Sequence, residues 1–476
     1  MSVLQMLILA VFAYSGMPAL PEPAERPPNV LLIAIDDLND WTGGLNGHPQ
    51  AKTPNIDRLA RMGTLFVNAH CQSPVCQPSR ASLMTSRLPS TTGLYFLNPG
   101  IAKAPALKGA LTIPERFAKE GYRVMGAGKL FHGGENRRYF AKAGEYGGNF
   151  GGFGPRPAKK ISYPQGHPLW DWGAFPDDDE KMPDRKIADW AIRKLKQSHE
   201  KPFFLAVGFY RPHVPMLVPK QWFDLHPRSE IKLPRVRDDD LTDVPRYARD
   251  LTTLGHVAPP HQWMVKHQEW RHAVQAYLAS TSFADHCLGR VLDALEASSH
   301  KDNTIVVLFS DHGFHLGEKN HWAKRTLWED GTRVPLVIAG PTLPAGQTSK
   351  RSVSLLDLYP TLLDLCDLDL DAAHEGTSLS PLLEDPAASW DRPALTFFGA
   401  GNASVRTTDW RYIRYVDGAE ELYHTSQDPH EWKNLAGSSA HRETKARLAR
   451  SIPSSYHAVL GKGSTGHRAY EAARKK

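Results

Sequence analysis

The sequence contains few cysteines, no hydrophobic run long enough to span a membrane, and no block of basic residues. Its 476 residues carry only four cysteines, Cys71, Cys76, Cys287 and Cys366. A chain of this length buries enough apolar surface to fold without a disulfide framework. The net charge of +6 is small for this length and comes without the Lys/Arg clusters that bind nucleic acid. We therefore expect neither a membrane span nor a nucleic-acid partner.

The N-terminus has an apolar segment that is too short to cross a bilayer comfortably. Residues 3–14 are apolar except for Gln5, and small residues near Ser15 resemble a cleavage site, although no basic residue precedes the run. A proline-rich stretch follows. We interpret residues 1–28 as a signal peptide and leader, which predicts an exported protein, periplasmic or secreted, or lysosomal in a eukaryote. A disordered or buried leader is the alternative.

Four apolar runs end in charged or imidazole side chains. They are residues 30–35 before Asp36 and Asp37, residues 122–127 before Lys129 and His132, residues 203–209 before Arg211 and His213, and residues 304–309 before Asp311 and His312. Apolar runs of this length are typical of strands buried on both faces of a parallel sheet. In open α/β sheets ligands bind beyond the carboxyl ends of the strands, so the four endings predict one shared site.

Helical patterns separate these runs. Thr53 is the expected N-cap of a helix that reaches residue 62, with Pro54 at its first position. Apolar residues at helical spacing predict two further helices, over residues 184–195 and 273–295, and we interpret their apolar stripes as core. The alternation of strands and helices predicts an α/β fold with a mainly parallel central sheet flanked by helices.

The pattern changes after residue 388. Short segments predict antiparallel strands at residues 394–398, 403–407 and 410–415. Residues 421–423 lead into a turn at Asp428-Pro429, and a terminal helix is expected over residues 439–452. We expect a main domain over residues 29–388 and a smaller C-terminal α+β subdomain over residues 389–476. Two long aperiodic stretches are expected to shape a substrate pocket; they are residues 140–179 and 227–260.

The segment Cys76-Gln77-Pro78-Ser79-Arg80 is the most informative in the chain. A cysteine in such a segment is more often an ordinary loop residue, and a pair such as Asp36-Asp37 is more often a helix cap. Taken singly, a residue such as His213 is more often a loop histidine, one such as His312 a core histidine, and one such as Lys324 a solvated charge. A chemical interpretation therefore depends on all of these residues occurring together and in order.

Together these residues resemble the type I sulfatases of the alkaline phosphatase superfamily, most closely the iduronate-2-sulfatase branch. The segment 76–80 matches the sulfatase motif C-x-P-S-R. The other matching segments, within about residues 29–436, are Asp36-Asp37, Gly128-Lys129-Leu130-Phe131-His132, Arg211-Pro212-His213-Val214-Pro215, Ser310-Asp311-His312-Gly313, Trp322-Ala323-Lys324, and Asp428-Pro429 with Asn434-Leu435. Two positions depart from many sulfatases: Ser86 stands for a glycine, and His312 stands for an asparagine, as in the iduronate branch.

The resemblance implies an alkaline-phosphatase-like fold and a role for each matching residue. In these sulfatases a maturase oxidises the motif cysteine, here Cys76, to formylglycine, whose hydrated aldehyde attacks sulfur and later expels sulfate. The implied ligands of one divalent cation, Ca²⁺, are Asp36, Asp37, Cys76, Asp311 and His312. The resemblance also implies five further catalytic groups. Arg80 would hold the nucleophile and the metal carboxylates, and Lys129 and Lys324 would bind sulfate oxygens. His132 would accept a proton, and His213 would protonate the leaving alkoxide. Three nearby histidines have no implied role; they are His70, His315 and His321.

The expected function is a sulfuric ester hydrolase that removes sulfate from a sulfated sugar, such as a 2-O-sulfated uronic acid of a polysaccharide. A phosphonate monoester or phosphodiester hydrolase of the same superfamily is one alternative, because tetrahedral anions of similar size suit one site. A non-catalytic protein that binds sulfated glycans is the other. The pocket loops decide the particular substrate. Asn402-Ala403-Ser404 is a glycosylation sequon, meaningful only in a eukaryotic secretory host.

Overall fold

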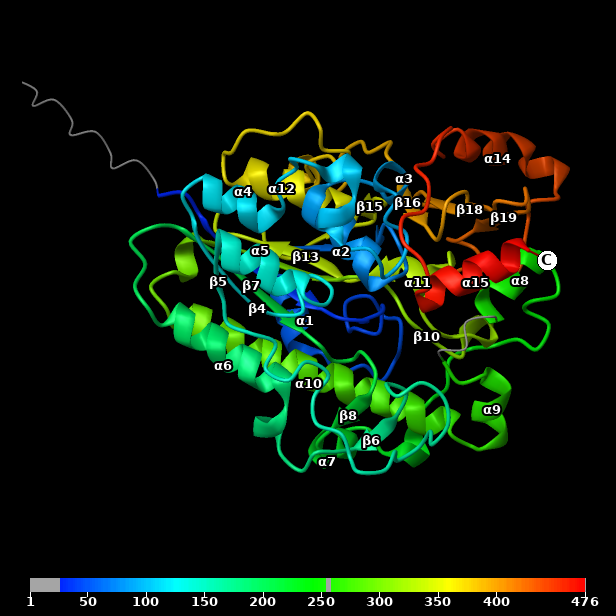
Figure 1. Ribbon diagram of the computed structural model, residues 1–476, viewed down its shortest axis with the longest axis horizontal. Coiled ribbons are helices and arrows are strands. Elements are labelled where there is room, and N and C mark those ends of the chain that lie inside the picture. Colours follow the sequence, from blue (N-terminus) through cyan, green and yellow to red (C-terminus); the bar gives the residue numbers. More distant parts are fainter. Residues whose placement is uncertain (1–25, 254–257, 476) are drawn as a thin grey trace, which may run out of the picture.

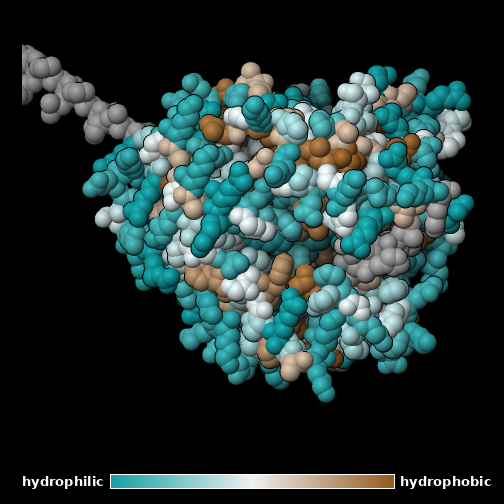
Figure 2. All heavy atoms as spheres, viewed as in Figure 1, coloured by the Kyte–Doolittle hydropathy of each residue, from teal (hydrophilic) through white to brown (hydrophobic). Residues whose placement is uncertain are grey.

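The computed structural model describes residues 26–253 and 258–475. The signal peptide predicted at the N-terminus lies in residues 1–25, outside the described residues, so the signal peptide and export stay predictions. In the described part of the chain, none of the helices is long and apolar enough to cross a membrane. On the face seen in Figure 2, hydrophilic side chains predominate and apolar ones form small separate patches.

An eight-stranded sheet runs through the centre of the molecule (Figure 1). From one edge to the other its strands are β14 (Gln347–Ser349), β2 (Thr64–Phe66), β13 (Leu336–Ala339), β9 (Thr304–Ser310), β1 (Asn29–Ile35), β7 (Phe203–Phe209), β4 (Arg123–Gly128) and β5 (Gly144–Tyr146). Strand β13 runs antiparallel to both of its neighbours, and the other pairs in the sheet are parallel. The predicted mainly parallel sheet is confirmed, and its four predicted strands are the adjacent strands β9, β1, β7 and β4.

Helices cover both faces of this sheet (Figure 1). One layer consists of α1 (Pro54–Met62), α6 (Pro183–Leu195) and α10 (Trp270–Glu296), and the other contains α2 (Cys76–Thr85), α4 (Ile113–Lys119), α5 (Glu135–Ala143) and α12 (Leu358–Leu365). Alternate residues of β1 face the two layers, so that Leu31 packs with the first layer and Leu32 with the second. The three predicted helices are confirmed as α1, α6 and α10. The Thr53 hydroxyl does not cap α1, because it accepts a hydrogen bond from the Gly43 N–H (2.9 Å) instead.

The central strands end at the same level of the sheet. Ile35, the last residue of β1, lies opposite Phe209 of β7 on one side and Ser310 of β9 on the other. Gly128, the last residue of β4, lies opposite Gly208 of β7. The residues that follow these strands therefore meet along one edge, the carboxyl edge, which is where α/β sheets bind ligands.

A second, antiparallel sheet is built from the C-terminal part of the chain. Its strands follow one another in order: β16 (Ala394–Phe397), β17 (Ala403–Arg406), β18 (Trp410–Arg414) and β19 (Glu420–His424). The three predicted strands are confirmed as β16, β17 and β18, and β19 is a fourth strand where the sequence predicted only a segment entering a turn. The helix predicted over residues 439–452 is a short 3₁₀ turn that continues as α14 (Arg442–Ala449). The domain boundary between residues 388 and 389 stays a prediction.

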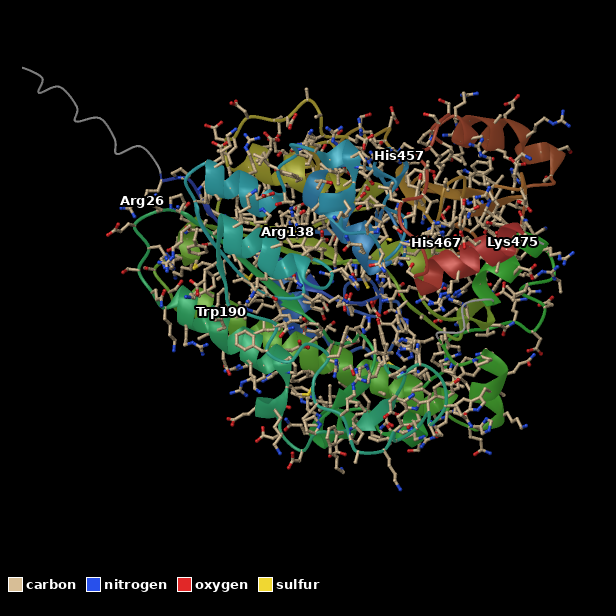
Figure 3. The ribbon with its side chains drawn as sticks, viewed as in Figure 1. Arg26, Arg138, Trp190, His457, His467 and Lys475 are labelled. Atoms are coloured by element: carbon tan, nitrogen blue, oxygen red, sulfur yellow. The ribbon has the colours of Figure 1, made fainter. Side chains whose placement is uncertain are left out.

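The prediction that this helix is the terminal one is wrong, because α15 (Thr465–Arg474) follows it. The ring of His467, labelled in Figure 3, stacks on Phe96 with the ring centroids 5.2 Å apart. The Tyr470 hydroxyl donates to the Ala400 carbonyl at 2.7 Å, and α15 also packs against α8 (Arg246–Thr253). A short, largely polar segment gives little helical signal by itself, since its stability comes from contacts far away in the sequence.

The two long stretches predicted as loops contain regular elements. Residues 140–179 include β5 and β6 (Trp172–Ala174), and β6 pairs in parallel with β8 (Met216–Val218). Residues 227–260 include α8. Strands of three residues are too short to show a period, so the sequence pattern could not reveal them. That these stretches shape a substrate pocket stays a prediction.

Gly208 of β7 occupies a position that only glycine fits. A Cβ atom there would lie 2.2 Å from the carbonyl oxygen of Lys129, which is a backbone atom. We expect Gly208→Ala to lower the free energy of unfolding by about 1–3 kcal/mol, because the backbone around Lys129 must shift. Gly437→Ala, where no heavy atom lies within 4 Å of the added carbon, is the control and should change it by less than about 0.5 kcal/mol. Urea denaturation checks this, and equal stabilities of the two variants would contradict it.

Candidate active site and metal centre

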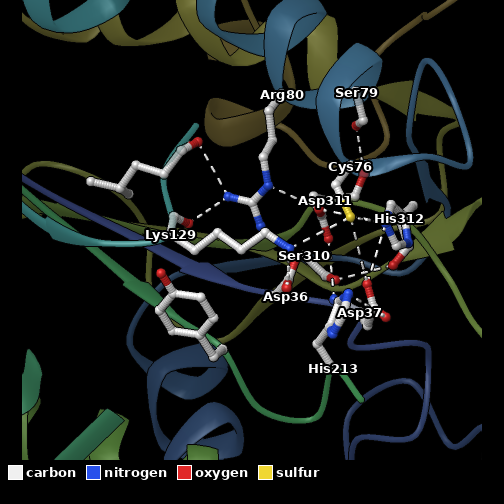
Figure 4. Close-up of polar contacts among 12 residues, drawn as sticks. Asp36, Asp37, Cys76, Ser79, Arg80, Lys129, His213, Ser310, Asp311 and His312 are labelled. Carbon is white, nitrogen blue, oxygen red and sulfur yellow. Dashed lines mark hydrogen bonds and ion pairs between the residues drawn. The ribbon is translucent and has the colours of Figure 1, made fainter. Parts of the chain in front are cut away.

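Cys76 lies at the carboxyl edge of the sheet, as the first residue of α2 (Figure 4). Its side chain is buried, with 3% exposed. Extended backbone at Val75 leads into the helix, so Cys76 stands at the positive end of the helix dipole, which favours negative charge. The other predicted site residues are Arg80 on α2, Asp36 and Asp37 after β1, Lys129 and His132 after β4, His213 after β7, Asp311 and His312 after β9, and Lys324 after β11 (Trp322–Ala323).

Arg80, one helical turn after Cys76, holds three segments together. Its Nε donates to Asp311 Oδ2 and its Nη2 to Asp36 Oδ1, both at 2.9 Å, while its Nη1 donates to the Lys129 carbonyl at 2.5 Å. Burial alone would lower the pKa of the guanidinium, but the two carboxylates raise it above its ordinary value. Arg80 is therefore permanently charged, and it ties the ends of β1, β4 and β9 to α2.

Two ammonium groups converge on the Cys76 sulfur. Lys324 Nζ lies 3.2 Å from Sγ and 2.5 Å from Asp37 Oδ1. Lys129 Nζ lies 3.6 Å from Sγ and forms an ion pair with Asp36 Oδ2. Burial would lower the pKa of both lysines, but the carboxylates beside them raise it above the ordinary value. Two charged ammonium groups that meet at one buried atom form a site for an anion.

The two consecutive aspartates after β1 have opposite pKa shifts. Burial raises the pKa of both, but Lys129 and Arg80 beside Asp36 outweigh burial and bring its pKa below the ordinary value. Asp37 is paired with one cation, Lys324, and lies beside the negative charge of Asp36, so its pKa is raised to about 7. Asp37 is therefore the carboxylate of this site that has too little positive charge around it.

Two buried imidazoles turn an unprotonated nitrogen toward the site. Nδ1 of His312 donates to the Gly313 carbonyl at 3.0 Å. Nδ1 of His213 donates to the Val214 carbonyl at 2.6 Å. Burial lowers the pKa of both rings, so they are neutral and their Nε2 atoms carry a lone pair. Nε2 of His312 lies 3.3 Å from the Cys76 sulfur, which places this lone pair at the centre of the site.

The residues at this edge fit one divalent cation. Oδ2 of Asp37 is buried and makes no hydrogen bond to any residue that the structure describes. Two groups of ligand atoms each lie within 4.8 Å of one another: those of Asp37, Cys76, Asp311 and His312, and those of Asp36, Asp37 and His213. An unpartnered carboxylate oxygen among further carboxylates is the environment of a hard cation such as Ca²⁺, which prefers oxygen ligands.

His132 is half-buried at the margin of the site. Burial and, after it, the charge of Lys129 lower its pKa to about 4. Because of this lowered pKa the ring is neutral near pH 7. Across residues 26–253 and 258–475 its imidazole makes no hydrogen bond, so it is free to accept a proton. The three histidines without an implied role are held by hydrogen bonds to other groups: His70 to Asn68, His315 to Thr326, and His321 to the carbonyl of Lys324.

Sequence reasoning missed two residues that shape the site. Tyr277 of α10, interpreted as core only, donates its hydroxyl to the Asp37 carbonyl at 2.7 Å. Phe153 lies against the His213 ring, with centroids 4.8 Å apart, and the Lys129 ammonium lies over its ring. A tyrosine in an apolar stripe is a usable signal, because a buried phenol needs a hydrogen-bond partner. Phe153 stands in an aperiodic stretch and gives no such signal.

Comparisons with known proteins identify relatives over most of the chain. The family model Sulfatase matches residues 28–368, and the family model described as N-sulphoglucosamine sulphohydrolase, C-terminal, matches residues 317–457. A sulfatase of Formosa agariphila is 43% identical over 86% of this chain and 83% of its own length. Iduronate 2-sulfatase of Homo sapiens is 30% identical over 86% of this chain and 90% of its own length. The solved structure of a phosphonate monoester hydrolase of Agrobacterium radiobacter is similar with a TM-score of 0.73 and 22% identity, covering 89% of this chain and 94% of that chain.

Removing the charge of Asp37 tests whether the negative charge of this one carboxylate is poorly compensated in the protein without metal. An aspartate has a pKa of about 3.9 in an unfolded chain, whereas the folded protein without metal holds the Asp37 pKa at about 7. The folded state therefore binds this proton more tightly, and the resulting stability is present below about pH 4 and lost as the pH rises to about 7. In a chelator at about pH 8, we expect Asp37→Asn to raise the free energy of unfolding by on the order of 2 kcal/mol.

Urea denaturation at two pH values checks this expectation. The gain from Asp37→Asn should shrink toward about pH 5, where the wild-type carboxyl is protonated as well. Added Ca²⁺ should stabilise the wild type more than the variant, because the variant lacks one carboxylate ligand. Asp224→Asn removes an exposed charge that pairs with Lys220 and should have little effect at either pH. A variant no more stable than the wild type at about pH 8 would show that the charge of Asp37 is well compensated and would refute the expectation.

Proposed function

The chain belongs to the sulfatase family of sulfuric ester hydrolases, and we propose that it removes sulfate from a 2-O-sulfated uronic acid of a polysaccharide by means of formylglycine at position 76. Its activity as a sulfatase is directed at sulfated sugars. The observation that carries the proposal is the convergence of Lys129 and Lys324 on the Cys76 side chain. A buried anion site around a potential nucleophile suits a sulfate ester. The relative named iduronate 2-sulfatase supports the uronic acid.

Charge balance supports the binding of an anionic ester. The cluster consists of three carboxylates, those of Asp36, Asp37 and Asp311, and three cations, those of Arg80, Lys129 and Lys324. These charges balance formally, so a divalent cation in the same cluster creates an excess of positive charge that a sulfate ester offsets. Lys129 and Lys324 bind the non-bridging sulfate oxygens and hold the sulfur against position 76.

We propose Ca²⁺ as the cation because the potential ligands are mainly carboxylate oxygens. The residues that would hold it are Asp36, Asp37, Asp311 and His312, together with the side chain at position 76. When bound, the cation offsets the negative charge of the sulfuryl group and favours ionisation of the nucleophile. Arg80 holds Asp36 and Asp311 from the side of α2, so these carboxylates are placed before a cation arrives.

Formylglycine at position 76 requires a maturase during biosynthesis. Cys76 is 3% exposed in the folded protein, so the modifying enzyme must reach the segment 76–80 before folding is complete. The hydrated aldehyde supplies a nucleophilic hydroxyl and a second hydroxyl that allows sulfate to leave, an exit that an unmodified thiol lacks. The proposed mechanism therefore depends on whether position 76 carries a thiol or formylglycine in the active enzyme.

His213 and His132 are placed to move protons. Burial and the charges of Lys324 and Lys129 lower the pKa of His213, so its ring is neutral in the protein without substrate. A bound sulfate ester offsets these two charges, which allows His213 to take up a proton at Nε2 and deliver it to the leaving alkoxide. His132 has a pKa of about 4, is neutral at higher pH, and is able to accept a proton.

The alternative functions have less support. The similarity to a phosphonate monoester hydrolase, at 22% identity, shows a shared fold and not a shared substrate. The relatives at 43% and 30% identity are both sulfatases. A protein that only binds sulfated glycans has no need for a neutral, buried His312 ring turned toward the Cys76 sulfur. Rates on para-nitrophenyl sulfate and on the matching phenylphosphonate ester, measured side by side, distinguish the two hydrolases.

We expect active enzyme to carry formylglycine at position 76, and Cys76→Ala to lose at least about 10⁴-fold in sulfate release because the nucleophile is gone. Mass spectrometry of the tryptic peptide that contains position 76 checks the modification. Cys71→Ala is the matched control, because Cys71 is a buried cysteine outside the ligand groups, and this variant should keep the wild-type rate. Fully active enzyme with an unmodified thiol at position 76 would rule out formylglycine.

The role of His213 predicts a dependence on the leaving group. His213→Gln should lower kcat by about 10²- to 10⁴-fold for a sugar sulfate, whose alkoxide needs a proton to leave. The loss should be smaller for para-nitrophenyl sulfate, because its phenolate leaves without a proton. His300→Gln, at a half-buried histidine outside the site that is bonded to the Gln197 carbonyl, is the control. Equal losses of His213→Gln on the two substrates would mean that His213 has only a structural role.

A further inference from the structure

Arg325, the residue after Lys324, carries a guanidinium for which the described part of the chain offers no partner. Among residues 26–253 and 258–475 this guanidinium forms no ion pair and no hydrogen bond. The backbone N–H of Arg325 is bound, to the Pro74 carbonyl at 3.2 Å. Two other arginines at the carboxyl edge of the sheet do have acceptors: Arg80 donates to carboxylates and Arg211 to backbone carbonyls. Arg325 is therefore a cation whose position the protein does not explain by an internal contact.

The backbone holds Arg325 close to Cys76. Pro74, whose carbonyl accepts from the Arg325 N–H, is two residues before Cys76. Ala323 and Arg325, on either side of Lys324, have positive φ angles of 75° and 81°. Residues other than glycine adopt this region at a cost, and such strain gathers at functional sites. The strained turn thus brings two consecutive cationic residues to the site.

The electrostatics agree with this placement. The Arg325 side chain is half-buried, and burial lowers its pKa to about 10. The groups close enough to oppose this shift are Cys76 and Asp37. Arg325 also lies near His167, which belongs to the stretch 140–179. Burial is the main cause that lowers the pKa of His167, and the positive charge of Arg325 is the next. The guanidinium therefore lies between the catalytic cluster and a segment predicted to shape the pocket.

A half-buried guanidinium without a counter-ion is suited to bind an anion from solution. Removing a charge from water is costly unless an opposite charge or acceptors compensate for it. Lys129 and Lys324 already match the sulfate group, so the anion for Arg325 is a second one. A guanidinium binds a carboxylate through two parallel hydrogen bonds. The carboxylate of a sulfated uronic acid is such a second anionic group on the same molecule.

We infer that Arg325 binds the carboxylate of the sugar that loses its 2-O-sulfate, and that it thereby selects uronic acids over neutral sugars. The inference rests on the proposed function, because it requires the sulfate to be held by Lys129 and Lys324. It gives a specificity role to a residue outside the matching family motifs.

Two matched substrates test this pairing: a disaccharide with a 2-O-sulfated uronic acid, and the same disaccharide with the carboxylate reduced to a primary alcohol. We expect the wild-type enzyme to prefer the first. Arg325→Gln should lower kcat/KM for the carboxylate substrate by about 10- to 100-fold more than for the reduced one, the effect of losing a charge-assisted hydrogen-bond pair. Arg325→Lys keeps the charge without the planar fork and should recover part of this ratio.

Arg58→Gln is the matched control, since it removes a guanidinium from the surface, where Arg58 pairs with Asp293 at 2.5 Å. It should leave the ratio of the two kcat/KM values unchanged. Equal losses of Arg325→Gln on both disaccharides would overturn the inference while the proposed function stands. The inference would also be overturned if Arg325→Gln lost its activity on para-nitrophenyl sulfate, because this substrate has no carboxylate for Arg325 to bind. Wild-type enzyme that hydrolyses para-nitrophenyl sulfate but neither disaccharide would overturn the proposed substrate class, and the pairing with it.

Discussion

The buried guanidinium of Arg80 is the interaction on which the rest of the site depends. It reaches the ends of three strands at once, through Asp36 after β1, Asp311 after β9 and the Lys129 carbonyl after β4. A planar group with five N–H donors can satisfy acceptors in several directions, whereas a lysine ammonium is a single point of charge. Because Arg80 stands one helical turn after Cys76 on α2, one helix positions both the Cys76 side chain and the carboxylates.

The buried charges of the site depend on one another. Asp36 has a lowered pKa because cations flank it, while Asp37, the next residue, has a pKa raised to about 7 because burial and negative neighbours prevail there. Asp37 also carries the carboxylate oxygen that accepts no hydrogen bond from the part of the chain that the structure describes. A divalent cation would correct both features, since it supplies positive charge and a partner for the oxygen. The proposed cation and the proposed sulfate ester would therefore be coupled through a single cluster of side chains.

The C-terminal sheet supports the segment after β11, which carries the two neighbouring cations at the site. Arg411 of β18 donates to the Leu327 carbonyl at 3.0 Å and pairs with Glu431 at 2.5 Å. Glu431 in turn accepts from the Glu329 N–H at 2.9 Å. A buried network of this kind fixes geometry more than it adds stability. The smaller sheet thus takes part in the site, although the carboxylate and imidazole groups of the potential metal centre belong to segments that follow strands of the larger one.

The sequence by itself determined the parallel strands, their polar endings and the family to be expected, because apolar runs and short motifs are local patterns. The four apolar runs also placed the residues that follow them, such as Asp36, Lys129, His213 and Asp311, at one sheet edge. Only the tertiary structure decided how their charges pair, so the opposite pKa shifts of Asp36 and Asp37 had no counterpart in the sequence. The same holds for the hydrogen bond of Tyr277 to the Asp37 carbonyl, for helix α15, and for the guanidinium of Arg325, which pairs with none of the residues that the structure describes. The physical reason is distance: pairing and desolvation depend on groups that are far apart along the chain and meet only in the folded protein.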